Sequence, residues 1–418
     1  MTRASDVANI LKQPFTNTLG TSNYRAGVNA GDSVASGGNY NTVVGDEAGT
    51  AITTGDNNTF VGYVAGDAVT TGTESVAVGS NALSASVGAD KNTALGAYAL
   101  RNDTEGELSV AVGHQALNAQ NFTSATSAYN VAVGANAGVS LTTGEQNVFI
   151  GGLAGDELTT GDDNIAIGYQ AYGSSASSAS TGSNNVCIGK SAGAKLTSGG
   201  ANILIGDNAG NEITTANNNI IMGQLAGTHV NNSNGSYNVI IGHYNDTSSD
   251  TVDHELIIGY NVTGQGANNF TFGNGGTDSN IAFGATSITA PSDERYKEEI
   301  ETSTAGLSFI NDLRPVTFKW KKEKDIPSDH RSYVENSETR VMGGHDTTRH
   351  GFIAQEVKTA IDNHSEIKDG FEMWSVDPND GRQRLAPSEL IPMLVKAIQE
   401  LSDKNTALEA RVTALENA

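Results

Sequence analysis

Ser292 and Lys297 are the two residues of this chain whose types and spacing could carry out chemistry. A serine hydroxyl is a weak nucleophile until a base removes its proton, and a lysine amine can be that base when it is shielded from water. Five residues span about 17 Å in an extended chain, so either the segment bends or Lys297 acts on a neighbouring subunit. The alternative is structural, because Ser292 or Asp293 could simply cap the first turn of a helix.

The composition of the chain changes at the same place. Residues 1–291 contain 7 Lys and Arg against 23 Asp and Glu, residues 292–418 contain 17 against 24, and the formal net charge of the whole is −23. Both Trp residues lie in the second part. A domain boundary is therefore predicted at residue 292. A surface this acidic repels phosphate backbones and anionic membranes, so we expect neither nucleic acid nor a membrane as a partner.

Several other classes of function are disfavoured by residue types. Cys187 is the single cysteine, which excludes a disulfide framework, and no Cys/His cluster has zinc-site spacing. Because Cys187 occupies an apolar position of a repeat, we expect it to pack. The first thirty residues lack the apolar core of a secretion signal, and no apolar run reaches 18 residues. We expect a soluble protein, made in a cytoplasm, with no cofactor and no metal.

An internal repeat fills the first part of the chain. Each unit has the form Asn, three apolar residues, Gly, two variable residues and Ala, and most units are 17 residues long. A degenerate first unit covers residues 23–31, and two shorter units end in Gly273 and Gly284. The glycines of the other units are Gly45, Gly62, Gly79, Gly96, Gly113, Gly134, Gly151, Gly168, Gly189, Gly206, Gly223, Gly242 and Gly259.

The repeat predicts a stack of short parallel strands. Each apolar run is β-branched and too short for a helix, Gly supplies the corner after it, and no proline occurs between Pro14 and Pro291. A coil of this length cannot bury its own apolar face, but stacked coils can, with strands about 4.8 Å apart. Ile203 and Ile205 share one strand face while Leu204 points to the other. Both faces are apolar, so we expect the second to pack against another copy. A homotrimer about a central axis is favoured, and two-chain packing remains open.

The units at residues 130–134 (Asn-Val-Ala-Val-Gly) and 164–168 (Asn-Ile-Ala-Ile-Gly) resemble the head repeats of trimeric autotransporter adhesins. Those heads are left-handed parallel β-rolls packed three together. The resemblance implies that architecture for about residues 23–284. The unit here is longer than is usual in that family.

Four groups of residues follow the boundary in order. They are 292–300 (Ser-Asp-Glu-Arg-Tyr-Lys-Glu-Glu-Ile), 313–321 (Leu-Arg-Pro-Val-Thr-Phe-Lys-Trp-Lys), 350–357 (His-Gly-Phe-Ile-Ala-Gln-Glu-Val) and 389–401, which begins Glu-Leu-Ile-Pro. In this order they resemble the intramolecular chaperone domain of phage tailspikes and tail fibres, the S74 peptidase family, over essentially all of residues 292–418.

That resemblance implies self-cleavage by a Ser–Lys pair, with Ser292 as nucleophile and Lys297 as its base. We favour the Ser292–Asp293 bond as the cleavage site. His350 could be an accessory acid or base, and a structural role for it is equally open. Glu356 is expected to be an ordinary helix-surface or capping charge.

The last segment predicts a helix with a coiled-coil seam over about residues 390–418. Asn405 takes one seam position, where a buried polar residue fixes the register of the chains. We expect the first turns, near Pro392, to pack on their own domain and the last three turns to associate with identical chains. The seam residues are Ile391, Leu394, Ile398, Leu401, Asn405, Leu408, Val412 and Leu415.

Together these features predict a mainly β protein, a trimeric parallel β-solenoid followed by a small α+β chaperone domain with a coiled-coil helix. Residues 1–22 would attach to the virion baseplate or a neighbouring fibre, 23–291 would form the solenoid, and 292–418 the chaperone and autoprotease. The predicted function is a homotrimeric phage tail fibre, assembled in the host cytoplasm and located in the virion tail, that binds a host surface receptor, either a glycan or an outer-surface protein. The alternative is a glycan-depolymerising tailspike, with candidate carboxylates at Asp156, Glu157, Asp162 and Asp163.

Overall fold

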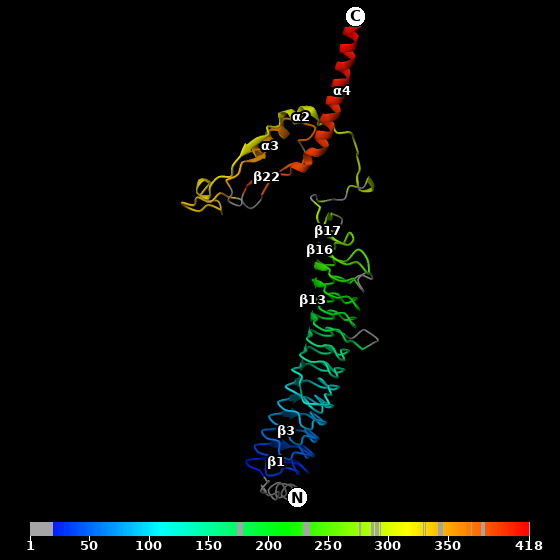
Figure 1. Ribbon diagram of the computed structural model, residues 1–418, viewed down its shortest axis with the longest axis vertical. Helices are drawn as coiled ribbons and strands as arrows, with labels where there is room; N and C mark the ends of the chain where they lie inside the picture. Colours follow the sequence, from blue (N-terminus) through cyan, green and yellow to red (C-terminus); the bar gives the residue numbers. More distant parts are fainter. Residues whose placement is uncertain are drawn as a thin grey trace, which may run out of the picture. The chain divides into compact units, whose positions relative to one another are not determined.

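The computed structural model of the protein divides into two compact units, Met1–Ser292 and Asp293–Ala418, and Figure 1 shows the elements of each. The structure describes residues 20–173, 179–228, 235–275, 277–285, 288, 292, 294–328, 330, 332–341, 346–368, 370–377 and 381–417. In those residues, no helix combines the length and the apolar character needed to cross a bilayer.

The first unit is a parallel β-solenoid, as predicted. One strand of each coil pairs with the strand of the next coil in a single sheet, and Figure 1 shows these strands stacked from β1 to β17. The register joins equivalent residues of successive repeats, as in Thr42 with Thr59 and Val148 with Ile165. The strands are β1 Tyr24–Ala26, β2 Thr42–Val44, β3 Thr59–Val61, β4 Val76–Val78, β5 Thr93–Leu95, β7 Val110–Val112, β9 Val131–Val133, β10 Val148–Ile150, β11 Ile165–Ile167, β12 Val186–Ile188, β13 Ile203–Ile205, β14 Ile220–Met222, β15 Val239–His243, β16 Glu255–Tyr260 and β17 Asn269–Asn274. Two short strands, β6 Gly106–Glu107 and β8 Thr126–Ser127, pair with each other outside this sheet.

Glycine is required at the corner after each strand because the coils stack closely there. At Gly151 the φ angle is +132°, and a Cβ would lie 2.5 Å from the carbonyl oxygen of Gly168 in the next coil. A side chain at this position would strain the backbone and push two coils apart. Coil stacking therefore explains the most regular residue of the repeat.

The structure decides which strand face is the interior one. The middle residue of the strand, such as Phe149, Cys187 or Leu204, is fully buried inside the coil. The residues one and three before each corner glycine point outward, and we call these two columns the outer stripe. The apolar face left for another copy is therefore the outer stripe and not the middle position. Its most exposed members, 36–44% accessible, are Val76, Leu95, Val133, Ile150, Ile165, Ile203, Met222, Ile241 and Ile258.

The asparagine that opens each unit forms a buried ladder along the solenoid. Asn147 donates from Nδ2 to the carbonyl oxygen of Gly161 (2.9 Å), and its Oδ1 accepts from the backbone N–H of Asn164 in the next coil (3.0 Å). Buried amides are tolerated only when they are hydrogen-bonded in this way. The recurrence of Asn was visible in the sequence, but this role was not predicted. Ser75 and Ser109 occupy two of the ladder positions.

The solenoid ends differently from the sequence prediction. Strand β17 pairs in parallel with β16, but β18, Ser279–Ala282, pairs antiparallel with β17. The short unit predicted to end in Gly284 is therefore not a further coil. Its 11 residues after Gly273 are too few to circle the solenoid, and the chain turns back at Gly275, where φ is +59°. The return strand pairs with the edge that the last coil would otherwise expose.

The second unit is a small α+β domain built around Phe309, Ile361 and Met373, which are buried together. Two antiparallel strand pairs, β19 with β20 and β21 with β22, accompany the helices. The elements are η1 Glu294–Tyr296, α2 Leu307–Asp312, β19 Val316–Phe318, η2 Glu323–Asp325, β20 Arg349–Gly351, α3 Ala354–Asp362, β21 Trp374–Val376, β22 Gln383–Leu385, η3 Pro387–Glu389 and α4 Leu390–Glu416.

The last helix, α4, has two apolar faces with different environments. Leu390 and Ala397 are buried against the domain, and Glu400 accepts a hydrogen bond from the backbone N–H of Leu307 at the start of α2 (2.9 Å). The first turns therefore pack on their own domain, as predicted, but through residues outside the seam. The predicted seam is exposed along the helix, from Ile391 (61%) to Leu415 (71%).

Candidate self-cleavage site

Ser292 lies at the junction of the two units, and its side chain is exposed. Asp293 lies outside the described residues. The next three residues form η1, a single 3-10 turn followed by a hydrogen bond from the backbone N–H of Lys297 to the carbonyl oxygen of Glu294 (3.0 Å). Such a turn rises about 2 Å per residue, much less than an extended chain. The chain from Glu294 to Lys297 is therefore bent and not extended.

The environment of Ser292 and Lys297 determines whether the lysine could act as a base for the serine. A lysine base must hold its amine close to the serine hydroxyl and be shielded from water, so that the amine can be uncharged. The side chain of Lys297 is exposed in the single chain. A role for Lys297 as a base would therefore need shielding that the single chain does not provide.

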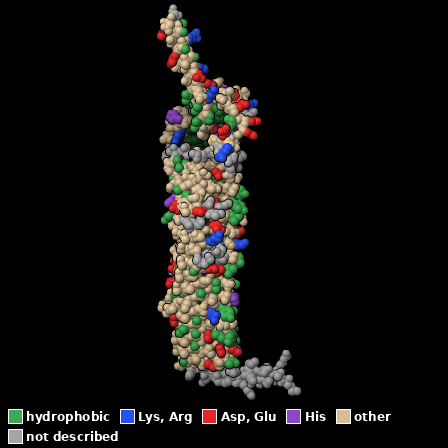
Figure 2. All heavy atoms as spheres, turned by 90° about the vertical axis from the view of Figure 1, so that its right-hand side faces the viewer, with side chains coloured by type: hydrophobic (Ala, Val, Ile, Leu, Met, Phe, Trp, Pro, Cys, Tyr) green, Lys and Arg blue, Asp and Glu red, His purple; other side chains and the backbone are tan. Residues whose placement is uncertain are grey.

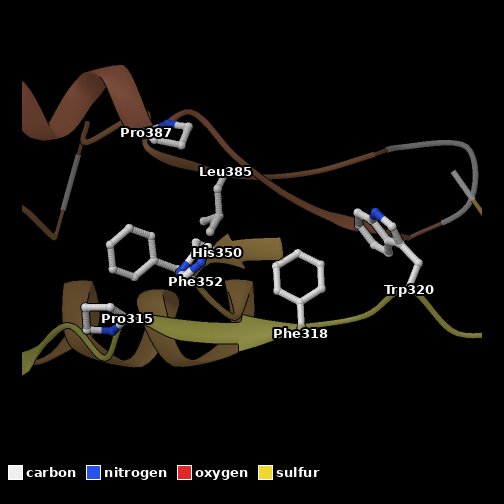
Figure 3. Close-up of a pocket in the computed structure, with 8 residues that line it drawn as sticks. Pro315, Phe318, Trp320, His350, Phe352, Leu385 and Pro387 are labelled. Atoms are coloured by element: carbon white, nitrogen blue, oxygen red, sulfur yellow. The ribbon is translucent and has the colours of Figure 1, made fainter. Parts of the chain in front are cut away.

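His350, the possible accessory residue, lies on β20 opposite Thr317 of β19. Its side chain lines an open pocket of about 690 Å³, and Figure 3 shows Leu385 pointing toward it across the pocket. The lining residues are Pro315, Phe318, Trp320, His350, Gly351, Phe352, Leu385 and Pro387. This lining is aromatic and aliphatic, and it includes neither Ser292 nor Lys297. The pocket therefore surrounds His350 with apolar groups.

Glu356, at the start of α3, forms a bidentate ion pair with Arg314. Arg314 Nε donates to Glu356 Oε2 at 3.0 Å, and a second bond joins Nη2 to Oε1. The Arg314 guanidinium lowers the pKa of Glu356. Both side chains are largely exposed, so the pair contributes little to stability. The pair joins the start of α3 to the segment before β19 at the surface of the unit.

A different histidine, His364, has the more constrained environment. Its Nε2 lies 2.8 Å from Asp312 Oδ2, its Nδ1 lies 2.9 Å from Glu366 Oε1, and its ring meets Phe309 edge-on at 5.4 Å. Hydrogen bonds to Asp312 and then to Glu366 raise the pKa of His364. The imidazole joins the end of α2 to the loop after α3. Sequence spacing gave no signal for it, because Asp312 is 52 residues away.

The carboxylates considered for the tailspike alternative lie in turns of the solenoid. Asp156 is 9% exposed, and burial together with the nearby charge of Glu157 raises its pKa to about 7. Asp162 accepts a hydrogen bond from the backbone N–H of Glu145 in the preceding coil (2.9 Å). Asp163 occupies a left-handed corner, with φ of +58°. Asp162 thus has a structural role in coil stacking, and Asp156 is largely covered.

Residues 292–366 match the family Peptidase_S74, described as chaperone of endosialidase. The matched segment begins at Ser292 and continues past the end of α3, which confirms the predicted resemblance over these residues; the group at residues 389–401 lies outside the match. No curated protein and no solved structure matches the chain. A β-solenoid followed by such a chaperone domain fits a tail fibre or tailspike that carries an S74 domain.

Proposed function

We propose that this protein is a homotrimeric phage tail fibre for host attachment, and that its second unit aligns three copies and is then released by self-cleavage beside Ser292. The observation that carries the proposal is the position of the family match. It begins at Ser292, which is also the last residue of the solenoid unit. The proposed nucleophile therefore stands where a cut would separate the two units.

Two exposed apolar surfaces support association of copies. The outer stripe runs along the solenoid, and the seam of α4 is open on the second unit. Single exposed apolar residues are ordinary, but contiguous rows of this length are typical of interfaces. Every copy of the chain carries both rows. Assembly of the copies about a shared axis is the simplest arrangement that buries both.

The outer stripe becomes more apolar toward the C-terminal end of the solenoid. Thr42 and Thr59 occupy it in early coils, whereas Ile203 and Ile205 occupy it in a late coil. Larger aliphatic groups gain more from burial, at about 25 cal/mol per Å². Contacts between copies would therefore be strongest in the coils that precede the chaperone unit in sequence. Stacked non-local strands form slowly, so a unit that aligns the copies first would speed assembly.

Cleavage would require the Lys297 amine to be shielded from water, and we propose that a neighbouring copy of the chain shields it. This would restrict cutting to assembled chains. Cleavage of the Ser292–Asp293 bond also restricts which nucleophile can attack, because the carbonyl carbon of that bond belongs to Ser292 itself. Attack by the hydroxyl of the same residue would close a strained four-membered ring. Attack by the Ser292 hydroxyl of another copy avoids that ring: it forms an ester with the Ser292 carbonyl and releases the amine of Asp293, and water then hydrolyses the ester. Attack by an activated water would break the same amide bond directly.

Denaturing electrophoresis with mass analysis tests the proposal. The wild type should yield fragments of residues 1–292 and 293–418, whereas Ser292→Ala and Lys297→Ala should stay whole. Lys297→Arg is the matched control. It keeps a positive charge but provides no base, so it should also stay whole. A wild type that stays intact after assembly would refute self-cleavage. Incubation of the cleaved protein with polysaccharide examines the tailspike alternative, which a fall in viscosity would support.

A further inference from the structure

The late coils of the solenoid carry a column of exposed and partly exposed side chains, one residue beyond each corner glycine. Backbone hydrogen bonds between successive coils show that the members are neighbours, as from Asn208 N–H to Lys190 O (2.8 Å) and from Leu225 N–H to Asp207 O (2.9 Å). We call this set the corner column. It consists of Tyr169, Lys190, Asp207, Gln224, His243 and Tyr260.

The C-terminal end of the corner column is an aromatic platform. His243 and Tyr260 are paired in register, with ring centroids 5.5 Å apart and planes inclined by 30°. Tyr244 adds a third ring, 4.1 Å from His243. Tyr260 is 53% exposed and Tyr169, at the other end, is 52% exposed. Because neighbouring coils hold these rings against one another, their exposed parts offer apolar surface to a ligand at little cost in side-chain entropy.

Between the aromatic ends stand an amide, a carboxylate and an ammonium group. Gln224 donates to Asp207 at 3.4 Å, and Lys190 is exposed beside them. Exposed aromatic side chains beside hydrogen-bonding groups match the chemistry of a sugar, which has apolar C–H groups and a rim of hydroxyls. The coils repeat about every 4.8 Å, a distance close to the length of one pyranose ring. A linear glycan laid along the axis would therefore meet one member of the column per sugar.

We propose that the corner column binds a linear, neutral glycan of the host surface. This inference rests on the proposed role in host attachment and names the ligand and the site. A neutral chain is favoured because the protein carries a net charge of −23, which repels polyanions. Figure 2 shows acidic side chains scattered along the solenoid surface. Three copies of the column in a trimer would add avidity to weak individual contacts.

The test uses the full-length wild-type protein after assembly, on an immobilised array of neutral and anionic bacterial polysaccharides. Binding to at least one neutral glycan is expected, with weak binding to the anionic series. Tyr260→Ala should reduce that binding by about tenfold, from loss of one aromatic contact. Tyr237→Ala is the matched control, because Tyr237 is 55% exposed and stacks on His254 of the next coil, but lies outside the column.

The outcomes separate this inference from the proposed function. A cleaved, trimeric wild type that binds no neutral glycan overturns the corner column as a glycan site while leaving the fibre proposal standing. Equal losses for Tyr260→Ala and Tyr237→Ala would also overturn it. If Tyr260→Ala instead lowers the trimeric fraction, measured by sedimentation, the column belongs to the contact between copies and the inference is wrong.

Discussion

Replacing Asp156 by Asn should stabilise the solenoid above about pH 7 and leave it unchanged near pH 4. Burial and the charge of Glu157 raise the pKa of Asp156 to about 7, from an ordinary value of 3.8. The folded coil therefore favours the neutral acid, and stability is lost as pH rises from about 4 to 7 and the group ionises. Asn has the same shape and no charge, so it should remove that loss. The difference in pKa corresponds to on the order of 4 kcal/mol at pH 8.

Hydrogen exchange followed by mass spectrometry provides the assay, because it reports the opening of individual coils. The peptide that contains residues 155–159 should exchange more slowly in the variant at pH 8, after correction for the intrinsic pH dependence, and equally at pH 4. Asp163→Asn is the control, since Asp163 is exposed and Asn tolerates its left-handed backbone. If the exchange rate of this peptide depends on pH in the same way in the wild type and in Asp156→Asn between pH 4 and pH 8, the carboxyl ionises without loss of stability and the reasoning fails.

Three further predictions concern the ladder, the outer stripe and the second unit. Asn147→Ala should destabilise its coil by about 2–4 kcal/mol, because it leaves the carbonyl of Gly161 and the N–H of Asn164 unpaired. Asn147→Ser should cost less, since serine occupies the ladder elsewhere, and equal protection from hydrogen exchange in both variants would contradict this. Ile203→Asp should abolish trimers in sedimentation, whereas Thr59→Asp, in an early coil, should weaken them less; the reverse order would refute the graded stripe. His364 has a raised pKa, so its contribution is present below about pH 6.5 and is lost as pH rises through the folded value. His364→Gln should therefore reduce the fall in melting temperature of the second unit as pH rises above about 6.5, and an unchanged fall would argue against the two carboxylate contacts.

The solenoid could be predicted from sequence because its determinants are local and repeated. A corner glycine, a strand of alternating faces and a fixed repeat length recur in many units. The prediction therefore depends on the agreement of all units and not on the sequence of any one of them. The prediction for the last unit was wrong, because Gly284 follows a return strand and does not close a further coil. The motif alone did not include the constraint that a coil needs enough residues to circle the core.

The assignment of strand faces also needed the structure. Alternation showed that Leu204 and Ile203 point in opposite directions, but both faces are apolar, so hydrophobicity alone could not say which is interior. The buried Asn ladder settles this, because Asn202 and Leu204 share a face and both are fully buried. In the second unit, motifs located the segment for which we propose cleavage, while His364 and Asp312 meet only through tertiary packing.

The most direct test of the account is to express residues 1–291 without the second unit and to measure their oligomeric state by sedimentation. The account predicts monomers or aggregates, with no stable three-chain particle, because nothing holds the copies in register while the coils form. Prompt assembly of this fragment into the same denaturant-resistant trimer as the full-length chain would contradict it.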